Sequence, residues 1–351
     1  TRWSLRNNLT NRKNEGYKRK PLVHYTSKCS LVFLRKIKEI NMPFAQGARS
    51  GLSYIPEVTF GVTPPTGNMT TIPYTGNSLN LTKEQITSAA LTPDRMIRND
   101  RHGNKQVAGD ISVEFAPADF DPFLESAFMN SWATNVLKVG TALKTFSVED
   151  ALNDVNVFRM FTGVTVGSLN LSVAPNQMAT ATMNLVGKDA VISTTSSKPV
   201  KTAAVGHAPF DSCSGSIMVG NAGGTLTAVA TITGIELNIN NDVSPAFVVG
   251  SCSTAQLEFG MATVSGSVTA YVENRDLYDR FINETETALQ FTLSNPAGNR
   301  PYTFLLPRVK FNSGDMPVSG PKSRIMTVNF SAIYDSTTNT VLQVTRTVPT
   351  P

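Results

Sequence analysis

The histidines and acidic residues are the side chains from which catalytic or metal chemistry would be built here. His102 lies in a charged stretch, but a catalytic histidine needs an orienting acid and a nucleophile, and the sequence offers no such set beside it. His207 precedes an Ala-Pro pair and is interpreted as an exposed loop residue. Asp119, Asp121 and Glu125 cluster, yet their spacing does not fit a calcium loop. Acidic residues are favoured near helix starts, so the structural interpretation is preferred.

Other signatures of chemistry are missing from the sequence. It has no nucleophile elbow, no phosphate-binding loop and no dinucleotide fingerprint. Its three cysteines, Cys29, Cys213 and Cys252, are too far apart for a disulfide scaffold or a cysteine-ligated zinc site. No stretch is apolar enough for a membrane span. We therefore predict that the protein is not an enzyme and that it holds no metal, no cofactor and no membrane anchor.

The basic character of the chain is confined to its beginning. The formal net charge of the 351 residues is +5, which would suggest a nucleic-acid binder. Residues 1–41 alone carry +9, however, and residues 42–351 carry −4. The bulk of the chain is therefore mildly acidic.

The basic segment 1–41 has neither a helical nor a strand period and reads as irregular. Lys38-Glu39-Ile40 can be encoded by a purine-rich run typical of a bacterial ribosome-binding site, a few nucleotides before the codon of Met42. We therefore predict that this segment is untranslated upstream sequence and that the functional chain starts at Met42. The alternative is a basic arm that binds nucleic acid.

From Met42 onward the pattern is that of an antiparallel β protein. Apolar and polar residues alternate in several runs, which indicates strands with one buried and one exposed face. These runs are centred on Val113, Leu171, Leu237 and Val328. Glycine and proline separate them, as turns require. The fold class predicted is mainly β, with two short helices near residues 117–129 and 274–283. Their predicted N-cap residues are Asp121, which is followed by Pro122 at the first helical position, and Asn274.

The helices stand in matching contexts, which indicates an internal duplication. Residues 109–115 lead into the first helix as residues 266–272 lead into the second. Upstream, Ser-Leu-Asn-Leu at residues 78–81 matches Glu-Leu-Asn-Ile at residues 236–239. Downstream, residues 182–185 match residues 327–330. One β-rich module is therefore repeated in tandem.

The duplication divides the chain into predicted parts. These are the basic extension 1–41, an N-terminal arm 42–69, a first module 70–192, a linker and lead-in strand 193–229, a second module 230–340 and a C-terminal tail 341–351.

The second module resembles a known family. Its motifs are Thr-Gly-Ile-Glu-Leu-Asn-Ile-Asn-Asn (233–241), Pro-Ala-Phe-Val-Val-Gly-Ser (245–251), Val-Ser-Gly-Ser-Val-Thr-Ala-Tyr-Val (264–272), Asp-Leu-Tyr-Asp-Arg-Phe (276–281) and Phe-Leu-Leu-Pro-Arg-Val-Lys-Phe (304–311). In order and spacing this series is similar to the major tail tube proteins of long-tailed, siphovirus-type bacteriophages. The similarity extends from about Arg49 to Tyr334 and is weaker in the first module.

The resemblance implies two tandem tail-tube modules, each a β-sandwich or half-barrel. It also implies a structural virion protein, made in the cytoplasm of the host bacterium, that polymerises into stacked rings around a channel for DNA ejection. DNA would be a partner only in transit, and a conduit of this kind is expected to have a negative wall. Other tail proteins, such as the tape measure, tail terminator and distal tail proteins, would meet the tube at its ends.

In this family, loops between early strands reach neighbouring subunits or rings. The matching segments here are residues 82–105 and 241–256. The candidate contact residues in them are Asp94, Arg95, Arg98, Asp100, Arg101, Asp242, Pro245 and Phe247. Because the chain carries two modules, a ring of three chains with approximate sixfold symmetry is favoured over a ring of six.

A different class of protein shares much of this pattern. A β-sandwich adhesin that binds glycans on a virion or cell surface would also have few cysteines and low charge. Sugar binding favours exposed aromatic platforms, and from Met42 onward the sequence has one tryptophan, Trp132. The adhesin therefore stands as the alternative.

Overall fold

The computed structural model describes residues 44–229, 231–298, 300–318 and 320–348 of the chain. The basic extension and the predicted start at Met42 lie outside these residues. The residues from Phe44 onward form one compact unit. Within the described ranges, no helix is both long and apolar enough to cross a membrane.

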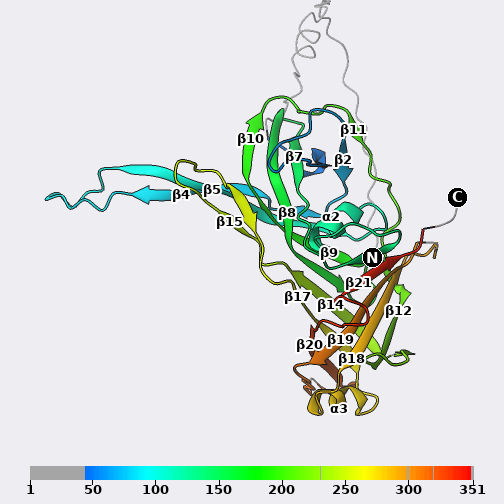
Figure 1. Ribbon diagram of the computed structural model, residues 1–351. Coiled ribbons are helices and arrows are strands. Elements are labelled where there is room, and N and C mark those ends of the chain that lie inside the picture. The colour runs from blue at the N-terminus through cyan, green and yellow to red at the C-terminus, as the bar shows by residue number, and fades with distance from the viewer. Residues whose placement is uncertain (1–43, 230, 299, 319, 349–351) are drawn as a thin grey trace, which may run out of the picture. The chain divides into compact units, whose positions relative to one another are not determined.

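The described chain is mainly β, as the alternating pattern predicts (Figure 1). The strands before residue 200 are β1 (Ser50–Pro56), β2 (Met69–Ile72), β3 (Gly76–Asn77), β4 (Asn80–Thr87), β5 (Asp100–Glu114), β6 (Val136–Lys138), β7 (Phe146–Leu152), β8 (Val157–Val173), β9 (Thr180–Gly187) and β10 (Asp189–Ser193). The later strands are β11 (Lys201–Thr202), β12 (Asp211–Asn221), β13 (Thr227–Ala228), β14 (Ile232–Asn240), β15 (Ser244–Ala246), β16 (Gln256–Glu258), β17 (Thr263–Tyr271), β18 (Thr287–Ser294), β19 (Tyr302–Phe311), β20 (Ile325–Ala332) and β21 (Gln343–Arg346). The helices are the single 3-10 turn η1 (Gly47–Arg49), α2 (Asp121–Ala127) and α3 (Asp276–Ile282). The predicted fold class is confirmed.

Alternation decides which side of each strand is buried. In β14 the side chains of Ile235, Leu237 and Ile239 are at most 3% exposed, whereas Glu236 between them is exposed. Successive side chains of a strand point to opposite faces, so this spacing places one apolar row against the core.

Two sets of six strands have the same order. The first strand set runs β4-β5-β9-β8-β7-β1, and the second strand set runs β14-β17-β20-β19-β18-β12. The registers agree as well. Gly109 pairs with Leu185 in the first set, and the equivalent Gly266 pairs with Phe330 in the second. The residues that match in the sequence therefore occupy matching places in the sheets.

A glycine is required at the same position in both sets because the neighbouring strand comes close. A Cβ on Gly109, whose φ is +152°, would lie 2.5 Å from the Ser78 carbonyl oxygen. A Cβ on Gly266 would lie 2.0 Å from the Glu236 carbonyl oxygen. Ser78 and Glu236 are the residues that the sequence comparison aligns, so the two close approaches are equivalent.

The two strand sets are joined edge to edge. The second half of β8 pairs with β9 on one side and with β14 on the other, so that Asn170 faces both Thr182 and Asn238. Just beyond β14, the buried Asn241 donates from Nδ2 to the carbonyl oxygen of Ala127, the last residue of α2, at 2.8 Å. We call the edge-to-edge pairing of β8 with β14 the internal junction.

Aromatic packing ties the predicted linker into the core. Phe210, which lies in the range 193–229, is fully buried, and its ring centroid is 5.3 Å from both Phe115 and Tyr302. These three rings come from the first set, the linker and the second set. The segment is thus packed between strands, although the predicted part boundaries themselves stay predictions.

The chain ends of the described unit also belong to the sheets. Strand β1, inside the predicted N-terminal arm, pairs with β7 and β2, and β21, inside the predicted C-terminal tail, pairs with β19 and β6.

Both helices form where the sequence places them, with small differences at their starts. Helix α2 begins at Asp121 with Phe120 as its N-cap, rather than with Asp121 in that role. Helix α3 has Arg275 as its N-cap, and Asn274 still contributes, because its Oδ1 accepts a hydrogen bond from the Asp276 backbone N–H at 2.9 Å. A side-chain oxygen near a helix start satisfies one of the otherwise free N–H groups.

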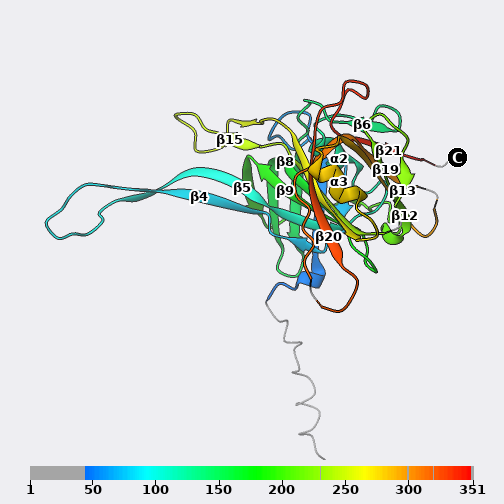
Figure 2. The same cartoon turned by 90° about the horizontal axis from the view of Figure 1, so that it is seen from below.

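One loop prediction is wrong in part. The segment 82–105 was expected to be a loop, but β4 and β5 form a hairpin that projects from the sheets, and only residues 88–99 connect them (Figures 1 and 2). His102 and its charged neighbours therefore lie in a strand. Antiparallel pairing between β4 and β5 satisfies the backbone N–H and C=O groups of this polar segment.

Candidate assembly surfaces

The tip of the β4–β5 hairpin holds one group of the predicted contact residues. Asp94 and Arg98 form an ion pair at 2.5 Å. The Asp94 carboxyl also accepts a hydrogen bond from the Thr92 hydroxyl at 2.6 Å, and this bond, above all, lowers the pKa of Asp94. Arg95 adopts a left-handed conformation with φ 60°. The tip is therefore a turn shaped by its own side chains.

The remaining predicted residues of this hairpin lie on its strands. Asp100 pairs with Thr87 and accepts a hydrogen bond from Gln85 Nε2 at 2.8 Å. Arg101 faces Ile86, which is 60% exposed. Three large apolar side chains near the tip are also exposed, namely Leu91, Met96 and Ile97. Exposed apolar groups on a projecting hairpin are typical of a surface that contacts another chain.

The second group of predicted residues lies in the shorter β15–β16 hairpin. Pro245 pairs with Leu257, Asp242 turns the chain with φ 49°, and Phe247 is half-buried. Beyond Phe247, the side chain of Val249 is completely exposed.

The β15–β16 hairpin lies against the first strand set. The Lys105 backbone N–H donates to the Cys252 carbonyl oxygen at 2.7 Å, and the Ser253 hydroxyl donates to the Asp189 carboxylate at 3.0 Å. The structure thus places the two predicted groups in two separate hairpins, with the shorter one packed near the base of the longer one.

A polar cluster under α2 joins the two strand sets. The Tyr302 hydroxyl donates to Asp121 at 2.6 Å and accepts from the Ala118 N–H at 3.0 Å. Arg346 forms an ion pair with the same carboxylate, and its guanidinium lies 4.3 Å from the ring centroid of Trp132. Burial raises the pKa of Asp121, against the opposing effects of Tyr302 and Arg346.

This cluster has consequences for the glycan-binding alternative. Trp132 is half-buried, and Arg346 covers one face of its ring. The ring is therefore unsuited to be a sugar platform.

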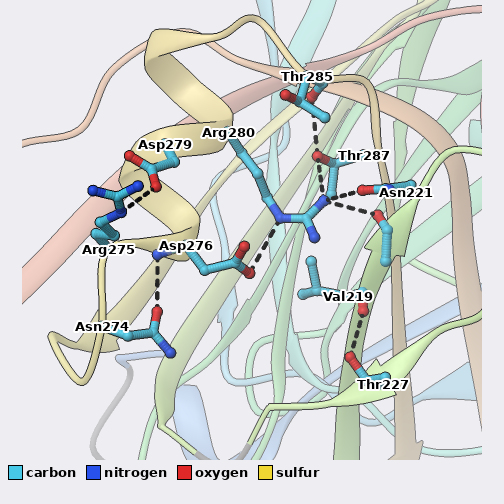
Figure 3. A network of polar contacts seen from close by, with 11 residues as sticks. Val219, Asn221, Thr227, Asn274, Arg275, Asp276, Asp279, Arg280, Thr285 and Thr287 are labelled. Atoms are coloured by element: carbon cyan, nitrogen blue, oxygen red, sulfur yellow. Dashed lines mark hydrogen bonds and ion pairs between the residues drawn. The ribbon is translucent and has the colours of Figure 1, made fainter.

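The equivalent helix α3 is held differently (Figure 3). Arg280 reaches from α3 to the β12 edge, where its Nη1 donates to Asn221 Oδ1 at 2.8 Å. Its Nε lies 3.3 Å from Asp276, and a second ion pair joins Arg275 and Asp279 at 2.8 Å. None of the residues of α3 is buried, whereas α2 buries four of its seven. The second helix is thus held by partly buried apolar side chains, Leu277, Tyr278 and Phe281, together with the contacts of Arg280.

Sequence reasoning missed the internal junction. Its signal was present in the repeated Leu-Asn-Leu and Leu-Asn-Ile motifs, since Asn170 and Asn238 face each other across it. Within the described ranges, no group of three or more His, Cys, Asp or Glu side chains could hold a metal ion.

Most of the chain is similar to a known protein family. Residues 47–332 match the model of a family described as phage tail tube protein. The comparison with curated proteins finds no match. Among solved structures, one similar chain comes from the anti-feeding prophage baseplate, determined by cryo-electron microscopy with sixfold symmetrisation. It shares 16% sequence identity at a TM-score of 0.27, over 37% of this chain and 92% of that chain.

Proposed function

Because the chain belongs to the phage tail tube protein family, we propose that it polymerises into stacked rings that form the tube of a long, siphovirus-type tail. It is a structural component of the phage virion. DNA would pass through the channel of the tube during ejection into the host. Other tail proteins, such as the tape measure, tail terminator and distal tail proteins, would be its partners at the ends of the tube.

The observation that carries this proposal is the internal junction. Two strand sets of the same order and register meet edge to edge through β8 and β14. A wall built from repeated modules needs such a lateral contact between one module and the next. The chain already contains one contact of this kind, so further copies can extend the wall in the same way and close it, which removes the free edges.

Two modules in one chain support a ring of three chains. Three copies would supply six modules, and because the two strand sets differ in sequence the ring would be strictly threefold and only approximately sixfold. The alternative is a ring of six chains with one strand set in the wall and the other outside it. Both sets retain the strand order that the wall requires, which favours three.

The channel is expected to repel DNA rather than hold it. Each Lys or Arg that neutralises a phosphate adds affinity, and a conduit must release its cargo. The net charge of −4 from residue 42 onward is consistent with such a wall.

Electron microscopy of the purified full chain tests the proposal. We expect tubes or stacked rings in negative stain, and symmetry analysis of their end views should give three chains per ring. Six identical chains per ring would show that only one strand set builds the wall. A chain that stays monomeric under all assembly conditions would contradict the function itself.

A further inference from the structure

The end of β19 differs from the end of its counterpart β8. Strand β8 continues to Val173, whereas β19 ends at Phe311 and is followed by residues 312–318, which we call the edge segment. The edge segment nevertheless keeps the register of β8. The backbones of Asp315 and Thr327 exchange hydrogen bonds of 3.1 and 3.0 Å, and the equivalent residues Asn170 and Thr182 pair in the first set.

The other side of this segment is where the two sets diverge. In the first set, residues 168–173 of β8 are paired with β14 on that side. Along the edge segment no second strand is present within the described residues. Instead, the carbonyl oxygen of Met316 accepts a hydrogen bond from the Arg324 guanidinium at 2.8 Å. A side chain thus satisfies a backbone group that a neighbouring strand satisfies in β8.

A complementary edge lies in the first set. Residues 77–82 pair with β5 as residues 235–240 of β14 pair with β17, so that Asn80 faces Ala108 as Asn238 faces Ser265. In β14 the opposite edge is covered by β8. For residues 77–82 no strand covers it within the described chain, and the Leu79 N–H donates to its neighbour Asn77 Oδ1 at 3.0 Å.

We propose that the edge segment of one copy pairs antiparallel with residues 77–82 of the next copy, in the register of the internal junction. Asp315 would then lie opposite Asn80, as Asn170 lies opposite Asn238 within one chain. Gly314 would face Leu81, and Met316 would face Leu79. This junction rests on the proposed ring assembly, because it needs a second copy of the chain.

The directions of the backbone groups fit this register. Asp315 turns its N–H and C=O toward β20, so by alternation those of Gly314 and Met316 point to the open side. The Ser78 N–H donates to the Asp110 carbonyl oxygen at 2.9 Å, so the groups of Leu79 and Leu81 point outward in the same way.

Proline in the edge segment is compatible with this pairing. Pro317 is two residues from Asp315, so the position of its missing N–H faces β20 and not the incoming strand. Proline removes one backbone donor, and here the missing donor is not on the side of the incoming strand. The proposed junction therefore loses no hydrogen bond to it.

Disulfide trapping tests the register. The background is the full chain with Cys29→Ser, Cys213→Ser and Cys252→Ser. One preparation carries Asn80→Cys and a second carries Asp315→Cys. These two positions would form a non-hydrogen-bonded pair with Cα atoms about 4.5 Å apart, within the range of a disulfide. After mixing, assembly and oxidation, we expect disulfide-linked dimers in the mixture and none in either preparation alone.

Placing both cysteines on one chain sharpens the test. Asn80→Cys with Asp315→Cys should give covalently closed rings. A control with Thr82→Cys and Asp315→Cys is displaced along the strands by about 7 Å, which puts the pair out of reach. A second control, Asn170→Cys with Asn238→Cys, should link within each chain even before assembly.

The outcomes separate the junction from the proposed function. Tubes that form without the Asn80–Asp315 link, or with equal linkage of the displaced pair, would overturn the junction and leave the tube function standing. Dimers from a single preparation would show a symmetric contact and would also overturn it. A chain that neither assembles nor links would overturn both.

Discussion

The two strand sets agree in order and register but differ in what covers them. Helix α2 buries Phe123, Leu124, Ser126 and Ala127, whereas none of the residues of α3 is buried. Residues 168–172 of β8 have a paired strand on each side, whereas within the described residues the edge segment after β19 has one. Strand β8 of the first set is thus paired on both sides within its own chain, while residues 77–82 at the far end of the set keep an open edge. In a duplicated protein, the covered repeat shows which contacts the uncovered repeat still needs.

Proline substitution at equivalent positions should separate folding from assembly. Ile239 is fully buried in the internal junction and corresponds to Leu81 at the open edge. Ile239→Pro loses buried apolar contacts and a backbone hydrogen bond, so we expect a loss of roughly 4 kcal/mol or more in the free energy of unfolding. Leu81→Pro should leave a folded chain that no longer assembles, since its N–H points outward. Urea unfolding and sedimentation would measure the two effects, and assembled Leu81→Pro rings would argue against the proposed junction.

Replacing the first-turn aspartate of each helix by alanine should lower the free energy of unfolding by unequal amounts. Asp121→Ala leaves Tyr302 and Arg346 without their shared carboxylate in a mostly buried site, which should cost about 3 kcal/mol. Asp276→Ala removes only a solvent-exposed partner of Arg280 and should cost less than about 1 kcal/mol. Thermal unfolding of both variants beside the parent would measure the difference. Equal losses would mean that the buried cluster does not hold the two strand sets together.

Lowering the pH should destabilise the first strand set more than the second, because the first set contains a buried carboxylate. Glu149 is 1% exposed; burial alone would raise its pKa, but hydrogen bonds from Lys201, Ser196 and Ser197 outweigh burial and lower it. Because the folded pKa lies below the ordinary value of 4.5, the stabilisation is present above pH 4.5 and is lost as the pH falls through the folded pKa.

Glutamine variants would measure this effect. Glu149→Gln should cost about 1–2 kcal/mol at neutral pH and flatten the stability profile below pH 4.5. Glu286→Gln is the matched control. A hydrogen bond from Arg308, 2.6 Å away, also lowers the pKa of Glu286, but this pair is partly exposed and solvent screens it. Its removal should change the profile little, and an equally flattened profile would contradict the assignment to Glu149.

A smaller effect is expected where the next copy would reach α3. By the alignment of the two sets, Asn241 corresponds to Lys83, and Ala127 at the end of α2 corresponds to Glu284 just after α3. Lys83 of the neighbouring copy should therefore lie near Glu284. Lys83→Glu should weaken assembly by about threefold, as expected for an exposed charge pair. Adding Glu284→Lys should restore it, and light scattering against concentration would show whether it does.

The sequence was sufficient for the fold class, because alternation and turn residues are local signals. It also revealed the repeat, because the motifs that begin at Gly109 and Gly266 match. The structure places these two glycines at equivalent close approaches of neighbouring strands. The sequence did not reveal the internal junction, because which edges meet depends on contacts far apart along the chain. The strand at Asp100–His102 was missed for a related reason: its side chains are polar on both faces, and only pairing with β4 makes it a strand.

Among the candidate contact residues, sequence reasoning located both hairpins but could not tell their roles apart. Pro245 and Phe247 belong to a hairpin that already lies against its own chain, whereas Asp94 and Arg98 stand at a projecting tip. That distinction depends on packing between Cys252 and Lys105, which no motif encodes.

The side chains of Asn77 and Arg324 have a consequence for newly made protein. Each side chain hydrogen-bonds to a backbone group on one open edge. Asn77 accepts from the Leu79 N–H, and Arg324 donates to the Met316 carbonyl oxygen. Two free copies must break these local bonds before they can pair, whereas copies that dock on an existing ring would be held side by side while they do so. We therefore expect subunits to accumulate in solution and to add mainly to existing ends, so that tube growth shows a lag that preformed seeds abolish.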